Sequence, residues 1–120
     1  IAKRYGYITI SIEKYSIQEQ VQILASCNYL ISEMGSSSCN ALLMPRLIGA
    51  IELTGPSTLG WWSMILPSTI YKWMYKRIVG SVVKSTRKIS DPNKIYNSTR
   101  DEDYLIDEEK FKETLDTFHR

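Results

Sequence analysis

The chain has 120 residues, of which 43% are hydrophobic and 23% charged, with a formal net charge of +2 at pH 7. This is the size and balance of one soluble globular domain, and no apolar run approaches the roughly 18 residues that span a bilayer. The first residue is Ile, and a strand pattern begins almost at once, so we expect a fragment of a longer protein.

The charge is distributed unevenly. Residues 61–88 carry six basic and no acidic side chains, whereas residues 89–120 carry five basic and nine acidic ones. A basic centre suggests an anionic partner or a membrane surface near the middle of the chain. Equally, these charges could form a solvated face that meets the acidic tail within the fold.

The first elements alternate between strand and helix. Tyr5 to Ile12 alternates with isoleucines on one side, which predicts a strand with an apolar face. Ser16 and Glu19 then have the spacing of a capping box, and an apolar stripe at helical spacing follows them. The helix should end near Cys27, and a buried strand is predicted from Tyr29.

A turn rich in small residues follows that strand. Gly35 can adopt backbone angles closed to other residues, and Ser36, Ser37 and Ser38 come next. The mostly apolar run from Cys39 to Met44 can start a helix, which Pro45 stops. A strand, a small-residue turn and a helix N-terminus together offer N–H groups and a positive dipole end to an anion. We regard this turn as the best candidate for a ligand site.

A third strand is predicted at Ala50 to Leu53, followed by a loop from Gly55 to Gly60. The order predicts a βαβα pattern with right-handed crossovers and a parallel sheet. Both loops follow strands, so they should emerge at the carboxyl edge of one sheet, where open α/β folds bind ligands.

The second half of the chain is predicted to hold more helices than strands. The expected elements are a short helix at Trp61–Leu66, a helix capped by Ser68 with Ile70, Trp73, Met74 and Arg77 at helical spacing, a fourth strand starting at Val82, a polar loop from Ile89 to Arg100, and a final helix capped by Asp107 with Phe111, Leu115 and Phe118 as its packing face.

The order of motifs over residues 16–56 resembles family 61 glycosyltransferases, which include capsular-polysaccharide-type bacterial enzymes. The segments that carry the resemblance are Ser16–Val21, Ala25–Ile31, Met34–Asn40, Met44-Pro45 and Ala50–Leu53, with a family-like close at Asp103–Glu108. The resemblance implies an α/β, Rossmann-like parallel sheet with flanking helices, forming the C-terminal, nucleotide-sugar-binding half of a two-domain GT-B enzyme. The donor would lie in a cleft against an N-terminal half of the same enzyme.

By position, the resemblance implies that Gly35 and Ser36 to Ser38 face the donor phosphates. Asn40 matches an Asn of the following helix, and Glu52 matches an acid at a strand end that hydrogen-bonds donor hydroxyls. One departure is Met34, which stands where the family usually has His; a thioether cannot donate a hydrogen bond to phosphate.

Further contacts are predicted in the basic segment. Trp61 and Trp62 could stack on a nucleotide base or a sugar, although packing of such large rings is the commoner use. Lys72, with Lys76 and Arg77 on one side of a helix, could offset diphosphate charge or touch anionic lipid. The resemblance implies metal independence, so we predict no metal and no cofactor. No convincing catalytic base is present, and we expect it on the other half.

The expected partners are a nucleotide-sugar donor, a glycan acceptor and the enzyme's N-terminal half. We expect a cytoplasmic location, with peripheral contact at the inner face of the membrane as a second option. Two other classes stay open. The first is a non-catalytic binding or assembly module that keeps the fold, and Met34 is the residue that would distinguish it from an active enzyme. A basic nucleic-acid-binding domain ranks third, because the chain has no recognised motif and little net charge, so we expect no nucleic acid.

Overall fold

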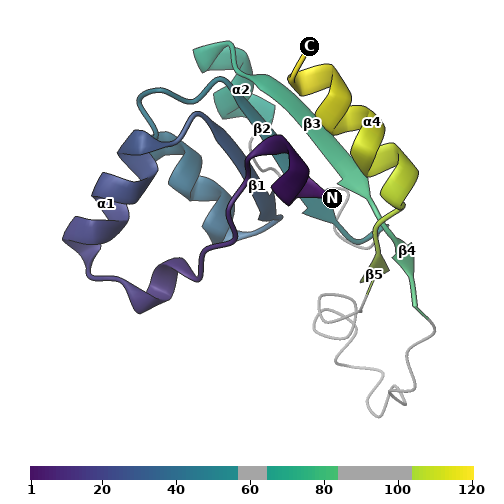
Figure 1. The fold of residues 1–120 in the computed structure, drawn as a ribbon, viewed down its shortest axis with the longest axis horizontal. Helices are drawn as coiled ribbons and strands as arrows, with labels where there is room; N and C mark the ends of the chain where they lie inside the picture. Colours follow the sequence, from purple (N-terminus) through teal and green to yellow (C-terminus); the bar gives the residue numbers. More distant parts are fainter. Residues whose placement is uncertain (57–64, 84–103) are drawn as a thin grey trace.

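The computed structural model describes residues 1–56, 65–83 and 104–120. They form a mixed α/β fold, in which helices flank a three-stranded parallel sheet (Figure 1). No helix in these ranges combines the length and the apolar character needed to cross a bilayer. Several predictions fall on residues outside these ranges, namely the contacts of Trp61 and Trp62, most of the helix expected at Trp61–Leu66, and the polar loop at Ile89–Arg100.

The main sheet has the order β1-β2-β3, and all its strands run parallel. Its strands are β1 (Tyr29–Glu33), β2 (Gly49–Thr54) and β3 (Met74–Val79). The strands predicted at Tyr29 and Ala50 are therefore confirmed. Around the sheet lie the 3-10 helices η1 (Ala2–Tyr5), η2 (Ile12–Lys14) and η3 (Ser36–Leu43), and the α-helices α1 (Ile17–Ser26), α2 (Ile65–Tyr71) and α4 (Glu108–Phe118).

Each face of the sheet has its own apolar cluster. On one face, Leu24 of α1 and Ala41 and Met44 from the η3 region pack with Ala50 of β2. On the other face, Ile51 and Ile78 pack against Leu115 and Phe118 of α4. The sheet is therefore covered on both faces, as expected for parallel strands. Figure 1 shows α1 and α4 on opposite sides of it.

Two of the three predicted helix caps, Ser16 and Asp107, are confirmed, whereas Ser68 lies inside α2 (Ile65–Tyr71) and does not cap a helix. Ser16 and Glu19 form a reciprocal capping box, in which the Ser16 N–H donates to Glu19 Oε2 (2.8 Å) and the Glu19 N–H donates to Ser16 Oγ (3.4 Å). The Ser16 hydroxyl also donates to Glu19 Oε2 (2.7 Å), and this bond, followed by the one from the Ser16 N–H, holds the pKa of the Glu19 carboxyl below its usual value. At α4 the carboxylate of Asp107 accepts from the Lys110 N–H (3.0 Å), and the predicted packing face of Phe111, Leu115 and Phe118 lies in the second apolar cluster.

The strand predicted at Tyr5 to Ile12 is wrong. The chain forms η1 and η2 at its two ends, and between them it makes no strand pairing within the described residues. Alternation specifies a strand only when an edge supplies hydrogen bonds, and here Ile8 is left 74% exposed. The first strand of the predicted βαβα pattern is therefore not formed in the described residues, and α1 is the first element of that pattern that the structure contains.

The helix predicted to run from Ser68 through Arg77 is also wrong. Helix α2 ends at Tyr71, Lys72 adopts the left-handed conformation (φ 57°), and Met74 begins β3. Pairing with β2 overrides the apparent helical spacing, because it satisfies a full strand of backbone groups. As a consequence Lys72, Lys76 and Arg77 do not share a helix face.

Two further predictions need smaller corrections. The helix after Gly35 begins at Ser36, three residues earlier than predicted, and it is a 3-10 helix. A strand does form at Val82, but β4 (Ser81–Val82) pairs antiparallel with β5 (Tyr104–Leu105) in a separate two-stranded sheet.

The Asp107 cap can be tested by mutation. Asp107→Ala removes the acceptor for the Lys110 N–H and should destabilise the fold by about 1 kcal/mol, measured by urea unfolding. Asp107→Asn keeps an acceptor at this position and should cost much less. Equal losses in the two variants would contradict a capping role.

Candidate functional site

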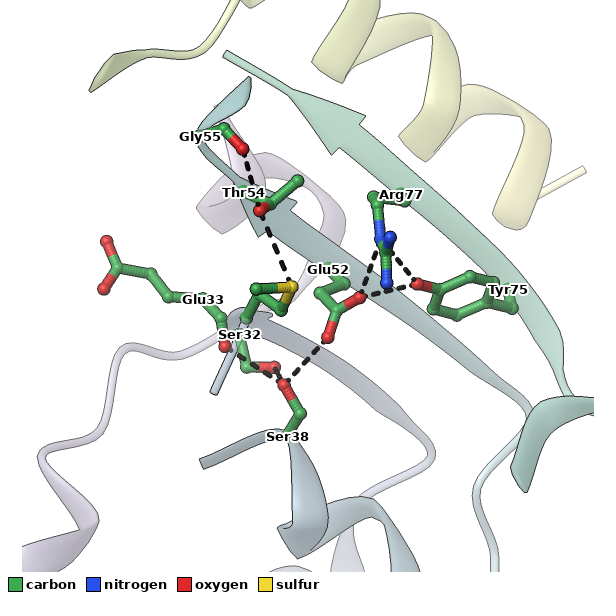
Figure 2. A network of polar contacts seen from close by, with 9 residues as sticks. Ser32, Glu33, Ser38, Glu52, Thr54, Gly55, Tyr75 and Arg77 are labelled. Atoms are coloured by element: carbon green, nitrogen blue, oxygen red, sulfur yellow. Dashed lines mark hydrogen bonds and ion pairs between the residues drawn. The ribbon is translucent and has the colours of Figure 1, made fainter. Parts of the chain in front are cut away.

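The Gly35 turn lies at the carboxyl edge of the main sheet, between the ends of β1 and β2. The Met34 N–H donates to the Leu53 carbonyl (2.8 Å), so the segments that leave the two strands start side by side. Figure 2 shows the polar side chains that lie next to these strand ends, which come from β1, η3, β2 and β3. The prediction that two loops emerge at one sheet edge is confirmed for their first residues, up to Pro56.

Gly35 has a backbone conformation that suits glycine. Its φ is 152° and its ψ is −163°, and it is the N-cap residue of η3. A Cβ placed on Gly35 would meet no atom within 4 Å, so the turn borders open space on that side. Another molecule can approach the backbone there closely, but a side chain at this position would be strained.

The serines of the turn have different surroundings. Ser38 is 3% exposed, and its hydroxyl lies 3.1 Å from both the Glu33 carbonyl and Glu52 Oε1, and 3.4 Å from Ser32 Oγ. Ser37 is exposed, and its hydroxyl donates to the Glu33 carbonyl (3.3 Å). Ser38 thus points into the fold, whereas Ser37 and the backbone of Ser36 lie at the start of η3.

Glu52 is the centre of a buried polar network. Its exposed fraction is 0%; Oε1 accepts from Ser38, and Oε2 accepts from the Tyr75 hydroxyl (2.6 Å) and from Arg77 Nε (3.1 Å) (Figure 2). Glu52 lies two residues before the end of β2. A hydroxyl of a bound nucleotide-sugar could reach this carboxylate only by displacing Ser38, Tyr75 or Arg77.

Arg77 forms an ion pair with Glu52, and its own side chain is 12% exposed. Burial lowers the pKa of Arg77, but its interactions with Tyr75 and then with the Glu52 carboxylate outweigh that effect and raise the pKa above its usual value. The guanidinium therefore stays charged at every pH at which the fold is studied.

Sequence reasoning missed Tyr75, and it placed Arg77 on a helix face with Lys72 and Lys76 instead of beside Glu52. Strand register brings them to Glu52: Ser32, Glu52 and Arg77 are direct neighbours across the three strands, on one face of the sheet. The signal available in the sequence was the i, i+2 spacing of Tyr75 and Arg77, which puts them on one face of a strand but not of a helix.

Met34 lies directly after β1, next to the end of β2. Its Sδ is 3.7 Å from Thr54 Oγ1, and Thr54 is 3.2 Å from the Gly55 carbonyl. The thioether thus sits at the ends of β1 and β2.

The other predicted residues are not brought to this network. Asn40 is partly buried and faces, with Ser37, a cavity beside the outer edge of β1. Lys72 is exposed and precedes β3, so it lies toward the amino edge of the sheet, away from the Gly35 turn. In the ranges that the structure describes, no group of three or more Asp, Glu, His or Cys side chains is placed to hold a metal ion.

Comparison of the chain with protein-family models, with curated proteins and with solved structures finds no match. Its function is therefore to be inferred from its own residues and geometry.

The Glu52 network should carry a measurable share of the stability. Tyr75→Phe removes a donor to a buried carboxylate and should destabilise the fold by about 1.5–3 kcal/mol in urea unfolding. The matched control is Tyr71→Phe, since Tyr71 is 60% exposed and its ring, which stacks on Trp73, is kept. That control should stay within about 0.5 kcal/mol of the wild type. An equal effect of both variants would show that the Tyr75 hydroxyl is not a significant partner of Glu52.

Proposed function

We propose that this chain is the nucleotide-sugar-binding domain of a GT-B glycosyltransferase similar to family 61, with a Rossmann-like sheet. The reaction would transfer a sugar from the nucleotide donor to a glycan acceptor. Support comes from the sequence resemblance over residues 16–56 together with the parallel sheet that these residues form.

The observation that carries the proposal is the place of the Gly35 turn. It follows a parallel strand, it lies at the carboxyl edge of the sheet, and it borders open space at a glycine. Ligands of open α/β sheets bind at this edge, and phosphates are favoured at the start of the following helix.

The hydrogen-bond donors that the turn offers to a ligand are backbone N–H groups. The first hydrogen bond of η3 runs from the Ser38 N–H to the Gly35 carbonyl (3.0 Å), so the N–H groups of Ser36 and Ser37 precede it. In the proposal these two groups and the Ser37 hydroxyl contact the diphosphate. Ser38 is held inward by Glu52, and it keeps the start of η3 fixed on the sheet.

The remaining parts of the proposal concern the rest of the enzyme. The catalytic base, which takes a proton from the acceptor hydroxyl, would come from the N-terminal half across the cleft. The proposal includes no metal, because the resemblance to GT-B enzymes implies a metal-independent transfer. In the proposal the enzyme is cytoplasmic, and the basic residues of the 61–88 segment would suit peripheral contact with the inner face of a membrane.

Met34 supports a second candidate, a non-catalytic module that keeps the fold. The thioether lies against Thr54 at the mouth of the site and cannot donate to a phosphate. If the module does no chemistry, it should still fold, and it should bind nucleotide weakly or not at all.

Calorimetric titration with UDP, GDP, CMP and ADP tests the proposal. One of these nucleotides should bind saturably, and Gly35→Val should weaken that binding at least about tenfold, because a branched side chain blocks the approach to the turn. Gly6→Val is the matched control, since Gly6 also has positive φ (85°) and open space at its Cβ. A nucleotide that binds Gly35→Val as well as Gly6→Val would refute the phosphate site. Absence of binding across the panel would leave two explanations, a domain that needs the N-terminal half of the enzyme or the non-catalytic module, and the same titration of the full-length enzyme would distinguish them.

Replacement of Met34 tests whether the site has lost a ligand contact. Met34→His should leave the fold intact and strengthen nucleotide binding about threefold to tenfold, since a hydrogen bond to a charged group becomes available. Met34→Leu adds no donor and should bind as the wild type does. Equal affinity in all three proteins would place position 34 outside the binding site.

A further inference from the structure

The amino edge of the main sheet lies opposite the Gly35 turn, and all three parallel strands begin there. Strands β2 and β3 start side by side, because the Met74 N–H donates to the Ile48 carbonyl (2.9 Å). The last turn of α4 is at the same edge, since a Cβ on Gly49 would lie 2.9 Å from the Phe118 ring. Figure 1 shows the end of α2, the start of β3 and the C-terminal end of α4 at this end of the molecule.

Large apolar side chains are exposed at this edge. Ile70 and Tyr71 are the last residues of α2, and their side chains are 63% and 60% exposed; Ile48 and Met74 are exposed as well. The Tyr71 ring stacks on Trp73, with the ring centroids 5.2 Å apart, and Trp73 packs in turn against the first apolar cluster. The exposed side chains are therefore attached to the core of the fold. We call this set the amino-edge surface, and its members are Ile48, Ile70, Tyr71, Lys72, Trp73 and Met74.

The turn between α2 and β3 holds a lysine in a conformation that lysine rarely adopts. The Trp73 N–H donates to the Ser68 carbonyl (3.1 Å), a closure that ends a helix when the residue before the donor is left-handed. That residue is Lys72, with a φ of 57°, where glycine or asparagine is usual. Lys72 therefore carries backbone strain, which in proteins is found mostly where a residue has a function. Its exposed side chain places an ammonium group among the apolar residues of the surface.

The charges around the amino-edge surface have one sign in the described part of the chain. Residues 34–83 contain one acid, Glu52, which is buried and paired with Arg77. At the adjoining end of α4, Asp116 accepts a hydrogen bond from the Tyr5 hydroxyl. The exposed basic side chains near this edge are those of Arg46, Lys72, Lys76 and Arg120. The surface is therefore apolar at its centre and positive around it.

We infer that the amino-edge surface docks on an anionic membrane surface. Tyr and Trp rings suit the boundary between head groups and acyl chains, and basic side chains are attracted to anionic head groups. An apolar patch alone would suit many partners, but a lysine among exposed apolar residues, with no exposed acid beside it in residues 34–56 and 65–83, is complementary to anionic lipid. The surface includes Ile48, so it extends beyond the basic 61–88 segment. It lies at the opposite edge from the Gly35 turn, and the inference does not depend on nucleotide binding.

Co-sedimentation of the full chain with lipid vesicles tests this inference. Vesicles of phosphatidylcholine with about 30% phosphatidylglycerol should bind the chain at least about tenfold more tightly than vesicles of phosphatidylcholine alone, and added salt should reduce the difference. Ile70→Asp should weaken binding to the anionic vesicles at least about tenfold, because it puts a negative charge in the apolar centre of the surface. Ile17→Asp is the matched control, since Ile17 is an 80% exposed isoleucine of α1, and it should bind as the wild type does.

Lys72→Gly separates the membrane contact from the stability of the fold. It removes the charge and also the backbone strain, so binding to the anionic vesicles should weaken about threefold to tenfold with no loss of stability in urea unfolding. Lys14→Gly, at an exposed lysine of η2, should leave vesicle binding unchanged.

The inference is overturned if anionic vesicles bind the chain no better than neutral ones, or if Ile70→Asp and Lys72→Gly bind them as tightly as the wild type does. Sedimentation velocity covers the other occupant of such a surface, a second copy of the chain. Dimers that Ile70→Asp dissociates, in a chain that does not bind vesicles, would overturn the inference in favour of that second copy.

Discussion

The arrangement of this domain depends on one buried charge, the carboxylate of Glu52 in the middle strand of the sheet. A charge that is removed from water is costly unless charged and hydrogen-bonding partners surround it. Here Arg77 and Tyr75 supply those partners from β3, and Ser38 supplies one from η3. The carboxylate is therefore satisfied only when β2, β3 and η3 have their observed register and position. Apolar packing alone would permit other registers, so the polar contacts specify the structure more than they stabilise it.

The Glu52 network also fixes the position of the Gly35 turn, and it does so through Ser38. The Ser38 hydroxyl contacts both Glu52 and the carbonyl of Glu33, so one residue joins the end of β1, the start of η3 and the centre of the sheet. The turn is a short segment that would otherwise be free to move, and a phosphate site needs its N–H groups fixed in advance. The ion pair thus serves the candidate site indirectly, by holding the structure from which the backbone donors project. Glu52 would have this effect whether or not it ever contacts a ligand.

The sequence predicted the elements whose signals are local. The capping box of α1, the Asp107 cap, the apolar run of β1 and the glycine turn depend on neighbouring residues, and they were found at their predicted places. Pairing over long distances was not predictable in the same way. Tyr5 to Ile12 has the alternation of a strand, but no edge pairs with it, whereas Met74 to Val79 was interpreted as a helix and became a strand beside β2. The Glu52 network was missed for this reason: its composition depends on register, and register is a property of the assembled sheet.

β1 joins the turn to the buried network. Its carboxyl end carries the Gly35 turn, and Ser32 lies directly beside Glu52 in the register of the sheet. The same strand therefore positions the backbone N–H groups of the turn and one neighbour of the buried carboxylate that holds Ser38. A change in the register of β1 against β2 would disturb both at once.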